Sequence, residues 1–353
     1  MSSIVRAVDV GFGNVKYTEQ TRGDEIACDH FPSLVYRSVR DTTAEGLGGR
    51  RRTVAIPIDG IYFEVGPEVH LAADAHRPSH LHDRFTESPE YLALLRGALH
   101  FMKVDRIDSL VIGLPVADFL SRRAALERLA LGEHDTGRGR KVLVKAVRVV
   151  AQPQGALAHY AAAAGKLRQL QDQQSLVIDV GARTFDWLVA RGLRLVPKKS
   201  GSANRGASDV IRALAEQISM DLGIRYGDLD AIDAAIRKRR PLSIFQRPYP
   251  LDKLEPIANA IADQAVSEML QSVGDLHSFE HIVLAGGGAF LFQKAIRKAF
   301  AKCKVQELRE PIYANVRGYQ LAGMDELREK EERATKALEA RAAGGEASDG
   351  ATP

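Results

Sequence analysis

A chain of 353 residues, 45% of them hydrophobic and 27% charged, is long enough for two domains and has the composition of a soluble globular protein. No apolar run reaches the roughly 18 residues of a membrane span and no basic-plus-apolar signal opens the chain, so we expect a cytoplasmic protein without membrane contact. Two cysteines without metal-type spacing exclude a disulfide framework, and a net charge of +4 is too small to indicate nucleic-acid binding by itself.

The first half of the sequence predicts a β-hairpin, further short strands, and then helices alternating with strands. Ile4–Val10 reads as a buried strand, and Val15–Tyr17 returns as the second arm of a hairpin. The pattern stays strand-like from 26 to 69 and is interrupted by a polar loop that ends in Arg50–Arg52. The elements that follow are a helix over 89–102, a strand over 107–115, a helix to 131, a loop over 132–140 and a strand over 141–150.

The second half repeats this order of elements. An alanine-rich helix starts at Gln152 and runs to about 170, and a second hairpin spans 176–190. Then come helices over 208–220, 226–240 and 257–273, a strand over 281–285, a helix over 290–302, a strand over 305–308 and a helix from 318. Both halves therefore predict an α/β fold with mixed sheets and flanking helices, and residues 344–353 are expected to be disordered.

A short motif occurs once in each half. Val8–Lys16 and Ile178–Asp186 both place Asp-Val-Gly after a buried strand, followed by two variable residues, a small polar residue, an apolar one and a charged one. A carboxylate thus ends each strand, and a glycine two residues on allows a sharp turn close to a ligand. Two such copies predict related lobes that close on an anionic ligand, with a metal between them.

These residues indicate phosphate and metal chemistry. Asp9 and Asp179 can flank Mg²⁺ through its waters, because that ion favours one or two carboxylates plus phosphates. Backbone N–H groups at 11–14 and 181–184 can cradle phosphate oxygens, with Lys16 beside the first turn. Gly286-Gly287-Gly288 lets a third backbone pass a flat ring or sugar. The sequence lacks a P-loop and a G-x-S-x-G elbow, and Lys16 stands where a dinucleotide fingerprint needs its third glycine.

The order of these motifs resembles the actin, Hsp70 and sugar-kinase ATPase superfamily. Asp9–Lys16 is similar to its first phosphate loop, Asp179–Asp186 to its second and Val283–Ala289 to its adenosine motif. Gln152-Pro153 and Asn315–Tyr319 fall where its two interdomain connections are expected. Within the superfamily the sequence most resembles the plasmid-segregation proteins of the ParM/StbA type, with the D protein of PRTRC plasmid cassettes as the nearest match.

The resemblance implies an actin-like (ribonuclease H-like) fold with two lobes, each a mixed sheet with flanking helices. Lobe I would comprise 1–155 and 315–343, with a small β-rich insertion over about 26–85. Lobe II would comprise 156–314, with a helical insertion over about 215–275, and 344–353 would form the disordered tail.

The resemblance also implies hydrolysis of ATP with Mg²⁺ between the lobes. Asp9 and Asp179 would hold the water shell of the metal, Lys16 would touch the β- and γ-phosphates, and Gln152 would position the attacking water, with Gln154 as a substitute. Asp186 would lie near the metal or be a polar strand end, and Asn315 would be part of the connection or only a turn residue. The remaining ligand-binding residues would be Gly11, Gly13, Asn14, Gly181 and Thr184 at the phosphates and Gly286, Gly287 and Gly288 at the adenosine.

Three functions remain open from the sequence. The first is an ATPase that forms nucleotide-dependent filaments and moves plasmid DNA through a separate DNA-binding adaptor. The second is a non-polymerising kinase or ATPase of the same superfamily. The third, which we regard as unlikely, is direct nucleic-acid binding through Arg50–Arg52, Arg138–Lys141 and Arg237–Arg240.

Overall fold

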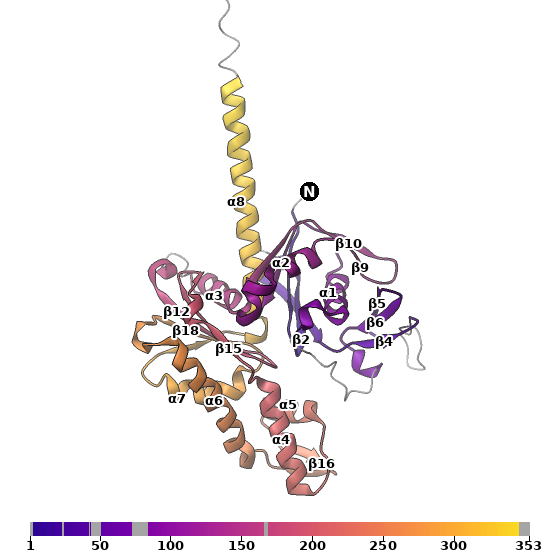
Figure 1. The fold of residues 1–353 in the computed structure, drawn as a ribbon, viewed down its shortest axis with the longest axis vertical. Helices are drawn as coiled ribbons and strands as arrows, with labels where there is room; N and C mark the ends of the chain where they lie inside the picture. The colour runs from indigo at the N-terminus through magenta and orange to yellow at the C-terminus, as the bar shows by residue number, and fades with distance from the viewer. Residues whose placement is uncertain are drawn as a thin grey trace, which may run out of the picture.

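The computed structural model describes residues 3–22, 25–41, 43, 51–72, 84–165 and 169–345, without the side chains of 337–345. Mixed sheets with helices packed on them form two lobes, and a long helix rises from the junction between them (Figure 1). Arg50 and the predicted tail beyond Gly345 lie outside the described residues.

The first lobe is built on a five-stranded sheet with the first hairpin in its middle. The strand order is β11-β8-β1-β2-β3. In that order the strands span Val147–Ala151, Ser109–Leu114, Val5–Val10, Asn14–Arg22 and Glu25–Pro32. Strand β1 pairs in parallel with β8 and antiparallel with β2, where Asp9 lies opposite Lys16. The carboxylate of Asp9 therefore emerges from the centre of the sheet rather than from its edge.

Two small sheets and two helices complete this lobe. Helix α1 (Pro89–Phe101) starts where it does because Pro89 suits the first helical position and the Ser88 side chain accepts a hydrogen bond from the N–H of Tyr91. Helix α2 spans Val116–Ala130. The small sheets are β4-β6-β5 (Tyr36–Ser38, Ile61–Val65, Val54–Ile58) and β7-β10-β9 (Arg106–Ile107, Lys141–Val144, Gly132–Asp135).

Two predictions for this lobe are wrong in detail. The predicted loop over 132–140 contains β9, which forms a hairpin with β10 around a turn of left-handed residues at Gly137, Arg138 and Gly139. The single strand predicted over 141–150 is two strands, β10 and β11, in different sheets. Strand β3, at the start of the predicted β-rich insertion, pairs with β2 in the five-stranded sheet, and the bounds of that insertion stay a prediction.

The second lobe repeats the hairpin and adds an insertion. Its sheet has the order β14-β13-β12-β18-β19, with β15 beside β13. In that order the strands span Arg194–Leu195, Phe185–Arg191, Gln174–Val180, His281–Ala285, Val305–Glu307 and, for β15, Gly201–Ala203. The helices are α4 (Ala207–Leu222), α5 (Leu229–Arg237), α6 (Glu255–Val273) and α7 (Ala289–Ala299). Asp179 lies opposite Asp186 in the β12–β13 hairpin, so the two lobes present equivalent turns.

The predicted helical insertion also contains a β-hairpin that the sequence did not indicate. Strands β16 (Leu242–Ile244) and β17 (Arg247–Tyr249) pair around a turn at Phe245 and Gln246. Both turn residues adopt positive φ, 49° and 62°. Glycine or asparagine usually marks such a turn, and neither is present, so the sequence carries no turn signal here.

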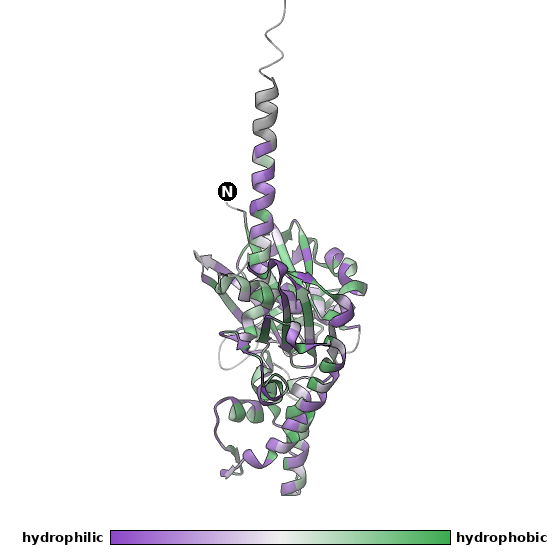
Figure 2. Cartoon of the chain, turned by 90° about the vertical axis from the view of Figure 1, so that its left-hand side faces the viewer, coloured by the Kyte–Doolittle hydropathy of each residue, from purple (hydrophilic) through white to green (hydrophobic). Residues whose placement is uncertain are grey.

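Two helices join the lobes. Helix α3 (Gln152–Ala163), predicted to reach about 170, ends earlier. It crosses helix α8 (Ala314–Gly345) at Gly155 and Gly318. A Cβ on Gly318 would lie 1.7 Å from the carbonyl oxygen of Gly155, so only glycine permits this approach. Beyond the body of the protein, α8 projects as a hydrophilic helix (Figures 1 and 2).

Each lobe has its own hydrophobic core, and a third cluster lies beneath α3. Phe31 and Leu94 are fully buried in the first lobe and Leu176 and Phe292 in the second, while Tyr160 packs α3 onto the second sheet. Short 3₁₀ helices connect the elements at Val69–Leu71, Phe85–Glu87, Gln169–Asp172, Pro197–Lys199, Asp252–Leu254, Leu276–Ser278 and Pro311–Tyr313. Within the described ranges, no helix combines the length and apolar character needed to cross a bilayer.

Candidate active site

The turns of the two hairpins share one backbone geometry and meet face to face. The N–H of Gly11 donates to the carbonyl of Asn14 over 3.1 Å, and that of Gly181 donates to the carbonyl of Thr184 over 2.8 Å. A Cβ on Gly13 would lie 2.7 Å from the methyl group of Ala182. The glycine at position 13 is thus required by the close approach of the two lobes.

The carboxylate of Asp9 is buried and fully engaged. It is 2% exposed, and its two oxygens accept hydrogen bonds from Nε2 of Gln152 over 2.8 Å and from Nζ of Lys16 over 2.9 Å. The Lys16 charge neutralises Asp9 within the hairpin, and Asp9 fixes the amide of Gln152 at the start of α3. Sequence reasoning named all three residues, and the structure brings them together.

Gln154, the predicted substitute for Gln152, has a different position. Its side-chain oxygen accepts a hydrogen bond from the N–H of Ala151 over 3.0 Å and so caps the first turn of α3. Gln152 lines the cleft between the lobes. The geometry therefore favours Gln152 as the residue that faces a ligand.

Asp179 is also buried, but its neighbour across the hairpin is another acid. Its carboxylate, 6% exposed, accepts a hydrogen bond from Nδ2 of Asn315 over 2.6 Å, and Oδ1 of Asn315 accepts from the N–H of Ala156 over 3.2 Å. Burial raises the pKa of Asp179 to about 7, and the charge of Asp186 adds to the rise. Asn315 is therefore more than a turn residue, because it ties α8 and α3 to this carboxylate.

Asp186 belongs to the same buried site. It is 1% exposed and accepts hydrogen bonds from the Ser202 hydroxyl, the Thr184 side chain and, over 3.4 Å, the N–H of Val116 at the start of α2. Burial raises the pKa of Asp186 as well. Asp186 is thus a buried, hydrogen-bonded residue near the start of β13, opposite Asp179, and its place beside a metal stays a prediction.

The glycine triplet Gly286-Gly287-Gly288 lies against the turn of the second hairpin. Gly286 has φ of +90°, where a Cβ would lie 2.3 Å from the carbonyl oxygen of Val180, and the N–H of Gly288 donates to that oxygen over 2.8 Å. A cleft of about 1230 Å³ opens between these loops and both hairpins. Its lining includes every predicted site residue: Asp9, Gly11, Gly13, Asn14, Lys16, Gln152, Asp179, Gly181, Thr184, Gly286, Gly287 and Gly288.

One side of the cleft was not predicted. Helices α4 and α5 of the insertion supply polar and charged side chains to it, because their inward faces turn toward the glycine triplet. Arg237 donates to the carbonyl of Gly287 over 3.0 Å, pairs with Asp233 over 2.6 Å and lies 4.2 Å above the ring of Phe290. The other polar residues of the two helices that line the cleft are Ser208, Arg212, Glu216, Ser219, Asp230 and Asp233, and the segment between the helices adds Arg225, Tyr226 and Asp228. Helical spacing shows which residues share a face but not what that face meets.

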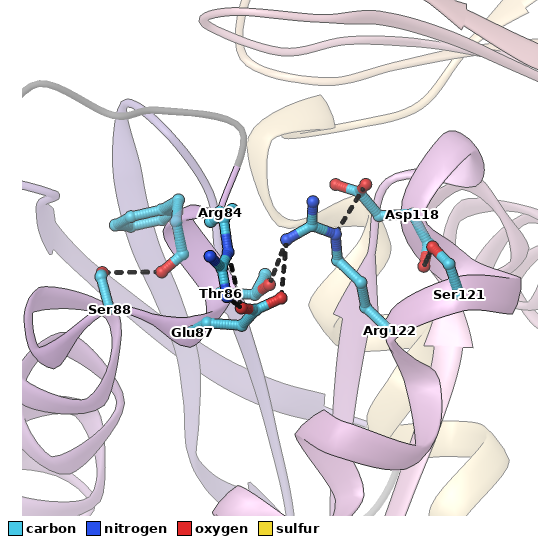
Figure 3. Close-up of polar contacts among 8 residues, drawn as sticks. Arg84, Thr86, Glu87, Ser88, Asp118, Ser121 and Arg122 are labelled. Atoms are coloured by element: carbon cyan, nitrogen blue, oxygen red, sulfur yellow. Dashed lines mark hydrogen bonds and ion pairs between the residues drawn. The ribbon is translucent and has the colours of Figure 1, made fainter.

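A polar cluster links α2 to the short helix before α1 at the mouth of the cleft (Figure 3). Arg122 pairs with Asp118 over 3.1 Å and reaches Thr86 over 3.3 Å and Glu87 over 3.4 Å, and Glu87 also pairs with Arg84. Thr86 and Asp118 line the cleft. The cluster thus holds α2 and the short helix Phe85–Glu87 together where they border the site.

Some cations of the basic clusters considered for nucleic-acid binding have partners within the chain. Arg51 pairs with Glu64 over 3.1 Å, and Lys141 with Glu133 over 2.7 Å. Arg138 donates to the carbonyl of Thr53 over 2.6 Å, and Arg237 is held at the cleft. Lys238, Arg239 and Arg240 are exposed.

Comparison with known proteins covers both lobes. Residues 7–155 match the N-terminal domain of actin-like proteins, and residues 177–298 match the C-terminal domain of archaeal MreB-like actin homologues. No curated protein matches the chain by sequence.

Solved structures agree with the family matches. The archaeal actin homologue Ta0583 is 22% identical with a TM-score of 0.74, covering 92% of this chain and 99% of its own. A ParM subunit from a 15-stranded filament of Clostridium botulinum is 17% identical with a TM-score of 0.70, covering 92% and 100%. The apo ParM of pSK41 is 19% identical with a TM-score of 0.67, covering 94% and 100%. The fold is therefore actin-like, and the chain belongs to the actin-like protein family.

Proposed function

We propose that this actin-like protein binds and hydrolyses Mg²⁺-ATP in the cleft and forms nucleotide-dependent filaments that segregate plasmid DNA. The observation that carries the proposal is the pair of buried carboxylates, Asp9 and Asp179, at equivalent turns that face one cleft. A structure of the archaeal homologue Ta0583, 22% identical with a TM-score of 0.69, is a complex with ADP, which supports a nucleotide in the corresponding place.

The residues of the cleft fit a magnesium nucleotide. Two buried carboxylates suit a hydrated Mg²⁺, and the absence of a Cβ at Gly13 lets the two turns approach each other closely. Bound Mg²⁺ supplies charge neutralisation for the phosphates. Lys16 adds a positive charge, and the turn N–H groups other than those of Gly11 and Gly181, which bond within the turns, would donate to phosphate oxygens.

Gln152 is the residue best placed to orient the attacking water. Asp9 holds its Nε2, which leaves the amide oxygen to accept a hydrogen bond from that water. A glutamine is too weak a base to take a proton early, but phosphoryl transfer depends mainly on alignment and charge stabilisation. The alternative, a non-polymerising kinase, calls for a carboxylate base at this place, and the amide of Gln152 argues against it.

The filament and its partners extend the proposal. The structure of a Clostridium botulinum ParM filament supports self-association of this fold. Plasmid DNA would be reached through a DNA-binding adaptor, since no DNA-reading motif is evident in the sequence. We expect this work to take place in the cytoplasm, and the nearer resemblance to the D protein of PRTRC cassettes stays a prediction.

ATP turnover by purified protein tests the site. The wild type should release phosphate in the presence of Mg²⁺, and Asp9→Ala or Asp179→Ala should reduce that release to background. An Asp263→Ala variant, which removes an exposed carboxylate of α6 outside the cleft, serves as the control and should retain turnover. Wild-type rates in both Asp9→Ala and Asp179→Ala would show that the metal assignment is wrong.

A further inference from the structure

Tyr91 is a buried residue whose ring packs next to the turn of the first hairpin. It lies in the first turn of α1, is 1% exposed and lines the cleft. Its ring packs edge-on against Phe85 at 5.3 Å, and Phe85 packs against Phe12 at 5.4 Å. The Ser88 cap holds its backbone N–H over 3.2 Å. The position of the Tyr91 ring is thus set by contacts that run through Phe85 to Phe12 in the turn of the first hairpin.

The Tyr91 hydroxyl has no hydrogen-bond partner within the part of the chain that the structure describes. Other buried tyrosines do have partners: the hydroxyl of Tyr319 donates to the carbonyl of Gln152, that of Tyr17 to Asp29 and that of Tyr160 to Gln306. Buried polar groups in folded proteins almost always have a partner. An unpartnered hydroxyl on the wall of a ligand cleft therefore points to a partner that arrives with the ligand.

The chemistry of this hydroxyl limits what it can do. Burial raises the pKa of Tyr91, and the neighbouring Asp9 carboxylate raises it further, so the group stays protonated and acts as a hydrogen-bond donor. Tyr91, Asp9 and Gln152 line the same cleft, and Asp9 holds Gln152. A water bound in the cleft beside Gln152 is therefore a suitable acceptor.

We propose that the Tyr91 hydroxyl donates a hydrogen bond to the water that Gln152 orients for attack on the γ-phosphate, which makes Tyr91 a positioning residue. The water then accepts from Tyr91 and donates to the amide oxygen of Gln152, so two side chains fix its orientation. The inference rests on the proposed ATPase function. It gives this chain a water-orienting group on α1 in addition to the one on α3.

Tyr91→Phe tests the inference because it removes only the hydroxyl. We expect kcat for ATP to fall about tenfold, the effect of losing one hydrogen bond in the transition state, while KM stays within about twofold. The Tm of the nucleotide-free variant should not fall, because the hydroxyl has no partner there. Tyr160→Phe is the matched control, and it should lower Tm and leave kcat unchanged at a temperature where it is folded.

The outcomes separate the two proposals. Absence of turnover in the wild type would overturn the ATPase function and this inference with it. Wild-type turnover with an unchanged kcat in Tyr91→Phe, or with a lowered Tm of that variant without nucleotide, would overturn the role of Tyr91 alone. A crystal structure of the wild type with Mg²⁺ and a non-hydrolysable ATP analogue should place an ordered water roughly 3 Å from the hydroxyl. A hydroxyl bonded to protein in that structure would contradict the inference.

Discussion

Asp179 and Asp186 lie directly opposite each other across the β12–β13 hairpin, at the register position where the first hairpin pairs Asp9 with Lys16. The duplicated hairpins therefore differ in charge: the first contains an ion pair and the second two acids. Burial and the Asp186 charge together raise the pKa of Asp179 to about 7. A cation between the lobes would relieve the repulsion between Asp179 and Asp186, whereas in the first hairpin Lys16 already neutralises Asp9.

The raised pKa of Asp179 predicts a pH-dependent stability of the protein free of metal and nucleotide. Because the pKa is about 7 in the folded state and 3.8 is the ordinary value, the folded state retains the proton between these values. The stabilising contribution is full below about pH 4 and is lost as the pH rises through 7. Asp179→Asn should remove this loss, so the Tm of the variant minus that of the wild type should increase from pH 5 to pH 8. A difference that is constant over this range, measured by thermal denaturation, would contradict the pKa assignment.

The crossing of α3 and α8 predicts a graded response to alanine. Gly318→Ala places a methyl group against the backbone of α3, and we expect a loss of about 3 kcal/mol of stability from overpacking. Gly323→Ala, on the same helix, meets instead the methyl groups of Val5 and Val111 at 2.7 and 2.9 Å, which have more freedom to shift, and should cost less. Chemical denaturation of both variants measures the difference, and equal losses would show that the crossing is not limited by backbone contact.

Arg237 should matter for nucleotide affinity rather than for DNA. Arg237→Ala removes the hydrogen bond to the carbonyl of Gly287 and the contact with Phe290. The glycine triplet is then held less firmly, and we expect a several-fold weaker affinity for ADP. The exposed neighbour Lys238, changed to alanine, should bind as the wild type does. Calorimetric titration decides, and the prediction fails if the two variants bind ADP equally well.

Variants of the two glutamines at the start of α3 should show which residue acts in catalysis and which one caps the helix. Gln152→Ala is expected to lower kcat on the order of a hundredfold, because the attacking water loses its orientation, and to cost about 2 kcal/mol of stability, because the buried carboxylate of Asp9 loses a hydrogen bond. Gln154→Ala removes a cap at Ala151 and should cost about 1 kcal/mol of stability with kcat nearly unchanged. Phosphate release and thermal denaturation of the same samples distinguish these results. The reverse pattern would assign the water to Gln154.

The sequence predicted the candidate site better than it predicted the periphery. Asp9 and Asp179 lie near the ends of buried strands in two different sheets. The local pattern located these residues and the glycines, and the duplicated motif with the family resemblance predicted that they meet in one cleft. The β16–β17 hairpin was missed because Phe245 and Gln246 adopt left-handed conformations without a glycine. Packing of the hairpin against the core of the second lobe, rather than local propensity, stabilises it.

The insertion side of the cleft could not be predicted for a different reason. Arg237 reads as part of a basic run, and only the packing of α5 against the glycine triplet shows that it meets Gly287. The unpartnered hydroxyl of Tyr91 is likewise invisible in the sequence, where Tyr91 is one of several apolar residues at helical spacing. Contacts between distant segments, rather than local pattern, define both features.

The most direct test of the proposed function is sedimentation of the purified protein with and without Mg²⁺-ATP, beside Asp179→Ala. We expect the wild type to pellet as filaments above a critical concentration only when Mg²⁺-ATP is present, and Asp179→Ala to remain in the supernatant. A wild type that stays in the supernatant at every concentration, while still hydrolysing ATP, would contradict the filament function and favour a non-polymerising enzyme.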